Sequence, residues 1–299
     1  MLSERLPSYG GQALLEGVVM RGSNAVASAV RAPDGHIEIH QEDLTGIYKS
    51  SIRKIPFLRG LILLWDALGL GIRFLTLSAN VQTGEEEKIE GPALYITLIG
   101  SMGLGIALFF VAPAAIAGWV EKLTGTGNLL SNLLEGIIRL LIMIGYIWGI
   151  GRMPEIARVF AYHGAEHKTI NAYEAHATLT PDVVSSYSLE HPRCGTSFLL
   201  TLVVISIIFF GLLGPMPLAL RLLSRVLLIP VLAGIAYEYI RWIANNIQSP
   251  FVQFLVKPNL ALQRLTTREP SKDMLEVSII AFTTMLHREE ELTKEALIV

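Results

Sequence analysis

The chain has 299 residues, of which 52% are hydrophobic and only 17% are charged. Soluble domains carry about 25% charged residues, and here the deficit is concentrated in several long apolar runs, which is the pattern of an integral membrane protein. The net charge of −2 gives no basis for a nucleic-acid partner. The single cysteine, Cys194, excludes an intrachain disulfide and fits a reducing compartment or a metal ligand.

Residues 1–56 form a polar, turn-rich segment. Residues 26–31 and 36–40 alternate between apolar and other side chains on either side of Pro33-Asp-Gly35. Alternation around an Asp-Gly turn is typical of a β-hairpin. We therefore expect a small β-hairpin element at the N-terminal end of a mainly α-helical protein.

Residues 57–81 are apolar but are interrupted by Arg59, Asp66 and Arg73. A spacing of seven residues places these three charges on one side of a helix. Charges in the middle of a bilayer are costly. The pattern therefore favours an interfacial helix, or one packed against other spans, over a lipid-exposed span.

Four further apolar runs predict transmembrane helices, since about 20 helical residues cross a hydrocarbon core of ~30 Å. The second run contains a glutamate and an arginine four residues apart, Glu135 and Arg139, which can pair within one helix. The four predicted spans are residues 93–119, 129–150, 197–213 and 218–243.

The distribution of Lys and Arg predicts the orientation of these spans. The segments before the first span, between the second and third (residues 151–196), and after the fourth carry most of these residues. The positive-inside rule therefore places both termini and the 151–196 loop in the cytoplasm, with the protein in the cell membrane. Arg221 and Arg225 then fall near the outer face, against this rule. The tail 244–299 contains an amphipathic segment, residues 273–288, which predicts a surface helix.

The residues with the clearest potential for chemistry lie in the 151–196 loop. Pro154 suits the first turn of a helix, and on that helix His163, His167, Ile170 and Glu174 share one face, with Glu166 at its edge. Two imidazoles at positions i and i+4 can bind one metal ion. The order His-x-x-Glu-His is that of the inverted zinc-protease motif, in which the histidines bind zinc and the glutamate is the general base toward water.

A second group of candidate ligands, His191 and Cys194, precedes the third span. Thiolate and imidazole together favour Zn²⁺ or a similar transition metal over Mg²⁺ or Ca²⁺. The polar stretch 176–192 is long enough to bring both residues back to the helix face. Arg193 lies between them and could bind an anionic substrate group.

The same residues also have simpler interpretations than a metal site. The histidines could pair with Glu166 and Glu174 in a polar interface, and Cys194 could be a small buried apolar residue. His176 lies on the opposite helix face and is not expected to be a ligand. Among the N-terminal glycines, Glu16 and Arg21 form either a loop ion pair or part of the same site.

Several motifs resemble a known family. These are residues 10–22, Tyr162-His-Gly-Ala-Glu-His-Lys-Thr-Ile170, His191-Pro-Arg-Cys-Gly-Thr-Ser-Phe198 and residues 265–270. They resemble the YqhQ-like bacterial membrane proteins, which are defined by a domain of unknown function and are described as predicted metal-dependent enzymes. The resemblance covers almost the whole chain. It implies His163, Glu166, His167 and Cys194 as the site.

Two functions follow as hypotheses. The first is a metal-dependent hydrolase at the cytoplasmic membrane surface. His163 and His167 bind zinc, with Cys194 and His191 or Glu174 completing the shell, while Glu166 moves protons and Arg193 holds substrate. The second is a non-enzymatic factor for membrane-protein assembly, insertion or regulation, with a structural metal and with the lipid bilayer and other membrane proteins as its partners. Three protein ligands plus water favour catalysis, and four protein ligands favour structure. A transporter ranks last, because the first span has no ionisable residue.

Overall fold

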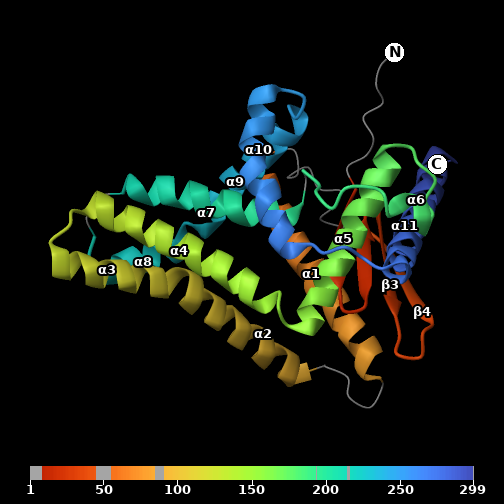
Figure 1. Cartoon of the computed structure of the whole chain (residues 1–299), viewed down its shortest axis with the longest axis horizontal. Helices are drawn as coiled ribbons and strands as arrows, with labels where there is room; N and C mark the ends of the chain where they lie inside the picture. The colour runs from red at the N-terminus through yellow and green to blue at the C-terminus, as the bar shows by residue number, and fades with distance from the viewer. Residues whose placement is uncertain (1–8, 45–54, 85–90, 193, 214–215, 299) are drawn as a thin grey trace.

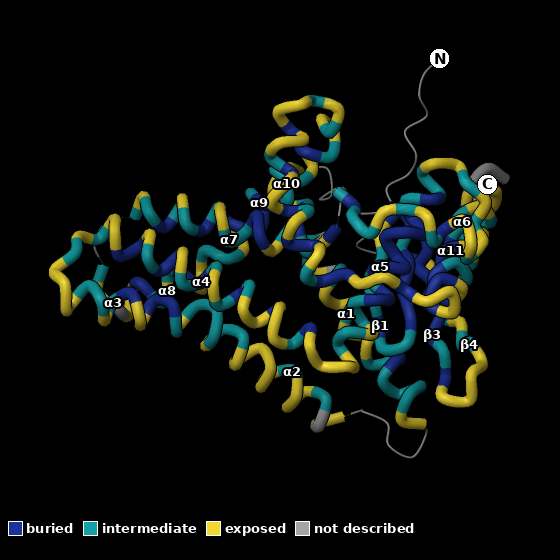
Figure 2. The backbone as a smooth tube through the Cα atoms, viewed as in Figure 1, coloured by how far each residue is buried: buried dark blue, intermediate teal, exposed yellow. Residues whose placement is uncertain are grey.

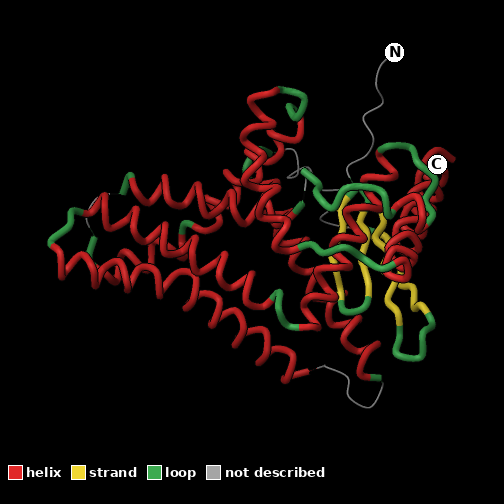
Figure 3. Tube along the Cα trace, in the orientation of Figure 1, coloured by secondary structure: helices red, strands yellow, loops and turns green. Residues whose placement is uncertain are grey.

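This computed structural model describes residues 9–44, 55–84, 91–192, 194–213 and 216–298. Figure 1 shows two parts: a body in which helices cover a β-sheet, and an arm of long helices that extends away from it. Within the described residues, strands occur only in the body and the arm is helical (Figure 3). Arg193, a predicted site residue, and the charged segment 85–90 lie outside the described residues.

The sheet of the body has four antiparallel strands in the described residues, in the order β1-β2-β3-β4. β3 and β4 form the predicted hairpin, with Val30 opposite Glu38 and a turn in which Gly35 has a φ of 94°. The prediction was incomplete, because the glycine-rich segment before it also forms two strands. The bounds are β1 Gly10–Leu14, β2 Gly17–Arg21, β3 Ala25–Arg31 and β4 Ile37–Asp43.

Helices cover both faces of the central strands, which explains why their sequences are apolar at successive positions. On one face, Val18 and Met20 are buried in a core with helices α5 and α11. On the other face, Val19 and Val26 are buried against Phe74 of helix α1. These three helices are α1 Leu58–Thr83, α5 Pro154–Glu174 and α11 Lys272–Ile298.

The predicted surface helix of the C-terminal tail is part of this core. α11 contacts β2, β3 and α5, and its Leu275, Phe282 and Met285 are fully buried. The apolar stripe therefore packs on the sheet instead of lying on a membrane surface. Two helices of the body and its junction with the arm were not predicted: α6 Pro181–Val184 and α10 Pro250–Thr266.

The arm contains long apolar helices. α2, a π-helical turn and α3 form one continuous rod, and Figure 2 shows exposed residues along it. Ile96, Ile99 and Met102 are large apolar residues that are exposed there. Such apolar exposure is typical of a lipid-facing surface. The helices are α2 Gly91–Ile106, the π-turn η4 Ala107–Val111, α3 Ala112–Thr124, α4 Asn128–Ile150, α7 Gly195–Gly211, α8 Leu218–Leu227 and α9 Ile229–Asn245.

Among the described residues, three helices are long and apolar enough to cross a membrane, or four if α8 and α9 together count as one broken span. The three are Leu58–Thr83, Leu94–Thr124 and Asn128–Ile150. α7 is apolar but has only 17 residues, and the predicted span 218–243 is bent by 43° between α8 and α9. The structure is therefore compatible with a membrane protein of three or four spans.

Helix α1 meets the span criteria although its sequence favoured an interfacial or packed helix. Its two arginines have partners in other elements. Arg59 donates to Glu238 of α9, with its Nε at 2.7 Å from Oε1, and Arg73 pairs with Glu42 of β4. Because α1 also packs on the sheet through Phe74, it joins the body to the arm.

The π-helical turn in the first rod provides a hydrogen-bond acceptor to the interior of the arm. Pro113 has no N–H, so it cannot donate to the carbonyl of Phe109 one turn earlier. That carbonyl accepts from Arg139 Nε of α4 at 2.9 Å instead. In an apolar environment a backbone carbonyl needs such a partner.

A cluster of buried charges connects α4 and α8. Glu135 is 1% exposed, and it pairs with Arg139 one turn later at 2.7 Å, as predicted. Arg221 and Arg225 of α8 also donate to Glu135, at 3.0 Å each through Nε. α8 therefore presents these two arginines to α4, so that the charges are paired inside the arm.

Candidate metal centre

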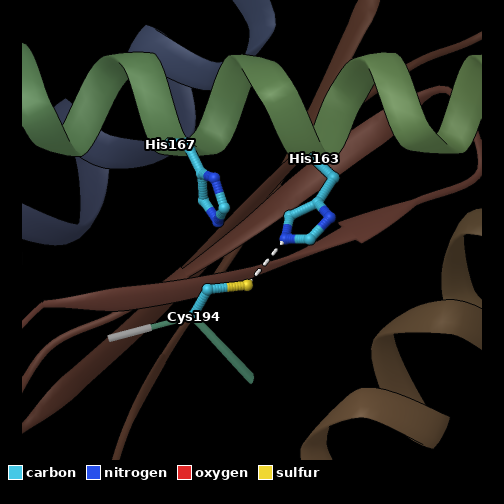
Figure 4. A group of neighbouring side chains, drawn as sticks. All are labelled: His163, His167 and Cys194. Carbon is cyan, nitrogen blue, oxygen red and sulfur yellow. Dashed lines mark hydrogen bonds between the residues drawn. The ribbon is translucent and has the colours of Figure 1, made fainter. Parts of the chain in front are cut away.

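The centre is built on helix α5, which begins at Pro154 as predicted. A proline suits the first helical turn because its missing N–H would have no partner there. His163 and His167 project from the same face one turn apart, and their ring centroids are 4.4 Å apart (Figure 4). The helical spacing therefore places the two imidazoles side by side.

Cys194 joins them from the end of the following loop. It is the N-cap residue of α7, and its Sγ accepts a hydrogen bond from Thr196 N. The same Sγ lies 3.2 Å from His163 Nε2, as Figure 4 shows. The loop after α5 thus brings the only cysteine of the chain back to the two histidines.

Backbone carbonyls orient both imidazoles. His163 Nδ1 donates to the carbonyl of Thr266 at 2.8 Å, and His167 Nδ1 donates to the carbonyl of Leu189 at 2.5 Å. With the proton on Nδ1, each ring presents the lone pair of Nε2. Histidines that bind metals are typically held in this way by a hydrogen bond from their other nitrogen.

The potential ligand atoms converge. One ligand atom each from His163, His167 and Cys194 lies within 4.8 Å of the others. His167 is 1% exposed, and its Nε2 has no hydrogen-bond partner among the described residues. A buried polar atom without a partner is costly, and a cation bound to Nε2 would satisfy it. Two imidazoles and a thiol fit Zn²⁺ or a similar ion.

Glu166 lies beside the three potential ligands. Its Oε2 is 3.8 Å from His163 Nε2 and 3.7 Å from His167 Nε2. Its Cγ packs so closely on β1 that a Cβ at Gly11 would lie 2.8 Å from it. Glu166 is therefore close enough to act on a molecule bound between the histidines, and a glycine in β1 is needed to accommodate it.

Residues 55–288 match the family model described as "Protein of unknown function (DUF1385)". The chain belongs to this family. It is also 34% identical to "Uncharacterized protein YqhQ" of Bacillus subtilis (strain 168), over 95% of this chain and 93% of that protein. These matches confirm the resemblance found in the sequence. No solved structure matches the chain.

The other predicted ligands of this DUF1385 member, His191 and Glu174, lie farther out. The rings of His191 and His167 have centroids 5.8 Å apart, and His191 Nε2 is 3.7 Å from Glu174 Oε2. Neither residue belongs to the group of atoms within 4.8 Å. Burial lowers the pKa of His191, so its ring is held neutral. His176 follows the end of α5 and adopts a positive φ of 56°.

Several groups that position the residues of this candidate site were not predicted from the sequence. Gln263 is fully buried on α10, accepts from His191 N at 3.0 Å, and donates to Ser197 Oγ at 3.0 Å. The Leu189 and Thr266 carbonyls belong to the backbone, so the residue types at these positions do not indicate that they orient the imidazoles. The motif at residues 265–270 was the one available indication that this segment reaches the site.

Glu16, one of the alternatives raised for the N-terminal segment, holds the sheet to α5. Its carboxylate accepts from Arg158 Nε and Nη2, each at 2.5 Å, and from Tyr162 Oη at 3.3 Å. Tyr162 directly precedes His163, so this contact fixes β1 and β2 next to the candidate centre.

We expect the Glu16 contact to weaken in acid. The hydrogen bond from Arg158 holds the pKa of Glu16 below its usual value, so the stabilisation is complete above the unfolded pKa of about 4.3 and is lost as pH falls through the lower folded value. Glu16→Gln should lower the free energy of unfolding by ~0.5 kcal/mol at pH 7. Thermal unfolding of both proteins should converge toward pH 3, and a difference independent of pH would contradict this assignment.

Proposed function

We propose that this protein is a membrane-bound, metal-dependent hydrolase. His163, His167 and Cys194 would hold zinc or a similar transition metal. The observation that carries the proposal is the convergence of three potential ligand atoms within 4.8 Å, in which the Nδ1 of each imidazole is bonded to a backbone carbonyl. Three protein ligands leave a coordination position for water or substrate, as in catalytic zinc sites.

The metal would supply Lewis acidity and lower the pKa of water. The residues of the chain would do the rest. Glu166, with its carboxylate within 3.8 Å of both Nε2 atoms, would take a proton from the attacking water and return it to the leaving group. Arg193 would hold an anionic group of the substrate, as the sequence suggested.

The location follows from the helices that flank the site. Cys194 caps α7 of the arm, whereas the histidines belong to α5 of the body. The site would therefore lie where the body meets the cell membrane. The distribution of Lys and Arg favours the cytoplasmic face, with both termini on that side.

Metal analysis of the detergent-purified protein tests this function. We expect about one zinc per chain in the wild type, because two fixed imidazoles and a thiolate suffice for tight binding. His163→Ala and Cys194→Ser should each lose it. Glu166→Gln should keep the zinc but lose activity, because its proposed role is proton transfer.

His176→Ala is the matched control, since His176 lies in the same loop region but outside the site. It should keep the zinc of the wild type. X-ray absorption should find one sulfur and two nitrogen ligands from the chain. Metal content that is unchanged in both His163→Ala and Cys194→Ser would remove the proposed centre.

The non-enzymatic alternative has one observation in its favour. His191 is 3% exposed, and its Nε2 has no hydrogen-bond partner among the described residues. As a fourth protein ligand, it would close the site and make the metal structural. Loss of a nitrogen ligand from the absorption spectrum in His191→Ala would favour this alternative, and an unchanged spectrum would favour the hydrolase.

A further inference from the structure

A cavity of about 620 Å³ lies between the sheet and the arm. Gly10 and Gln12 of β1 form part of one wall, and Leu64 and Leu70 of α1 form another. Phe198 of α7 completes the apolar lining. Its volume lies in the range of sites for small molecules, which are ~300–1,000 Å³.

This cavity approaches the candidate metal centre at two points. Gly195 lines it and is the neighbour in sequence of Cys194. Gly11 also lines it, and the same glycine packs directly on Glu166. The cavity and the centre are therefore separated only by β1 and the first turn of α7.

The described lining of the cavity includes one charged side chain. Among the described residues that line the cavity, Arg21 is charged and none is acidic. Guanidinium groups form strong, often bidentate hydrogen bonds with phosphate. The lining thus combines one group suited to phosphate with a mainly apolar wall.

The apolar wall continues onto the surface of the arm. Leu199 lines the cavity and is 44% exposed on α7, and α1 is one of the helices able to cross a membrane. An acyl chain could therefore pass from the bilayer into the cavity without leaving an apolar environment. A water-soluble phosphate compound would not make use of this wall.

We propose that the cavity binds an anionic phospholipid, with its phosphate at Arg21 and an acyl chain along α1 and α7. This lipid site goes beyond the proposed function, because β1 and the first turn of α7 separate the cavity from the candidate centre. Burial of each CH₂ group and a phosphate–guanidinium contact together favour a lipid over its isolated head group.

Two glycines allow the cavity to be filled without a clash. Gly195 and Gly10 line the cavity, and a Cβ at either would meet no atom within 4 Å, so Gly195→Leu and Gly10→Val add side chains to the lining from two elements. Gly211→Leu is the matched control, because Gly211 is the last residue of the same helix and also has no atom within 4 Å of its Cβ. Arg21→Gln removes the charge.

Native mass spectrometry with added phosphatidylglycerol measures the binding. The wild type and Gly211→Leu should hold one phosphatidylglycerol in preference to phosphatidylcholine. Gly195→Leu and Gly10→Val should bind it about tenfold more weakly, and Arg21→Gln should lose a similar factor together with the preference, because a charged hydrogen bond contributes about that much. Glycerol phosphate at millimolar concentration should not displace the lipid.

Zinc content and thermal unfolding of the same samples separate the two proposals. If the protein contains no zinc but the cavity variants still weaken lipid binding, the hydrolase proposal is wrong and the lipid site stands. Equal phosphatidylglycerol binding by all folded variants, or displacement by glycerol phosphate, would overturn the lipid site while zinc binding could stand. If Gly195→Leu loses zinc or does not fold, the phosphatidylglycerol binding of Gly10→Val, which lies in β1, tests the lipid site instead.

Discussion

Glu135→Gln should lower the free energy of unfolding by about 3–5 kcal/mol, because it removes one partner from a buried ion cluster. Arg139, Arg221 and Arg225 each donate to this carboxylate, at 2.7–3.0 Å. Arg221 would keep its contact with Glu121 Oε2 at 3.2 Å. Arg139 and Arg225 would stay inside the arm with a neutral amide in place of the carboxylate. We therefore expect α8 to separate from α4 and the protein to unfold at lower temperature.

Thermal or denaturant unfolding in detergent micelles measures this effect. Glu155→Gln is the matched control, because Glu155 lies in the exposed first turn of α5 and should change stability by no more than ~0.5 kcal/mol. Arg225→Met in the Glu135→Gln background should recover part of the loss, since it removes one unpaired buried charge. Equal stability of Glu135→Gln and Glu155→Gln would show that the cluster does not hold the arm together.

Gly164→Ala should lower zinc affinity about 10–100-fold, the cost typical of disturbing the groups that orient metal ligands. A Cβ at Gly164 would lie 2.2 Å from the carbonyl oxygen of Arg268 and 2.7 Å from a methyl group of Leu189. The Thr266 and Leu189 carbonyls, which orient His163 and His167, would have to move with these segments. The ligands themselves would remain present.

Competition with a chelator measures the zinc affinity of this variant. Gly145→Ala is the matched control, because Gly145 is also inside a helix and a Cβ there would meet no atom within 4 Å. In a helix interior, alanine is otherwise favoured over glycine by up to ~1 kcal/mol, so the control should be as stable as the wild type or more so. Unchanged zinc affinity in a folded Gly164→Ala protein would show that the carbonyl contacts are dispensable.

Local patterns predicted the elements that depend on neighbours in sequence. The apolar runs located the long helices of the arm, since span length and composition are local properties. Pro154 located the start of α5, and the spacing of four residues placed His163 beside His167 and Glu135 beside Arg139. The alternation around Gly35 predicted β3 and β4.

Predictions that needed a distant partner were incomplete or wrong. The apolar stripe of α11 gave no indication that its partner is the sheet, because a helix facing a membrane and one facing a core have the same periodicity. The segment with β1 and β2 contains glycines that disfavour an isolated strand, and Gly11 is required there because Glu166 packs on it. The inward turn of Arg221 and Arg225 depends on Glu135 of another helix.

The sequence predicted one part of the candidate centre, and the tertiary structure decided the other. By itself the sequence determined that two imidazoles share one face of a helix with a carboxylate at its edge, because 3.6 residues per turn decide this geometry. Only the tertiary structure brought Cys194 to within 3.2 Å of His163 and placed the Leu189 and Thr266 carbonyls on the two Nδ1 atoms. The position of Cys194 depends on how the loop after α5 packs against the whole body, which no local pattern encodes. The position of a backbone carbonyl cannot be inferred from residue type, because every residue has one.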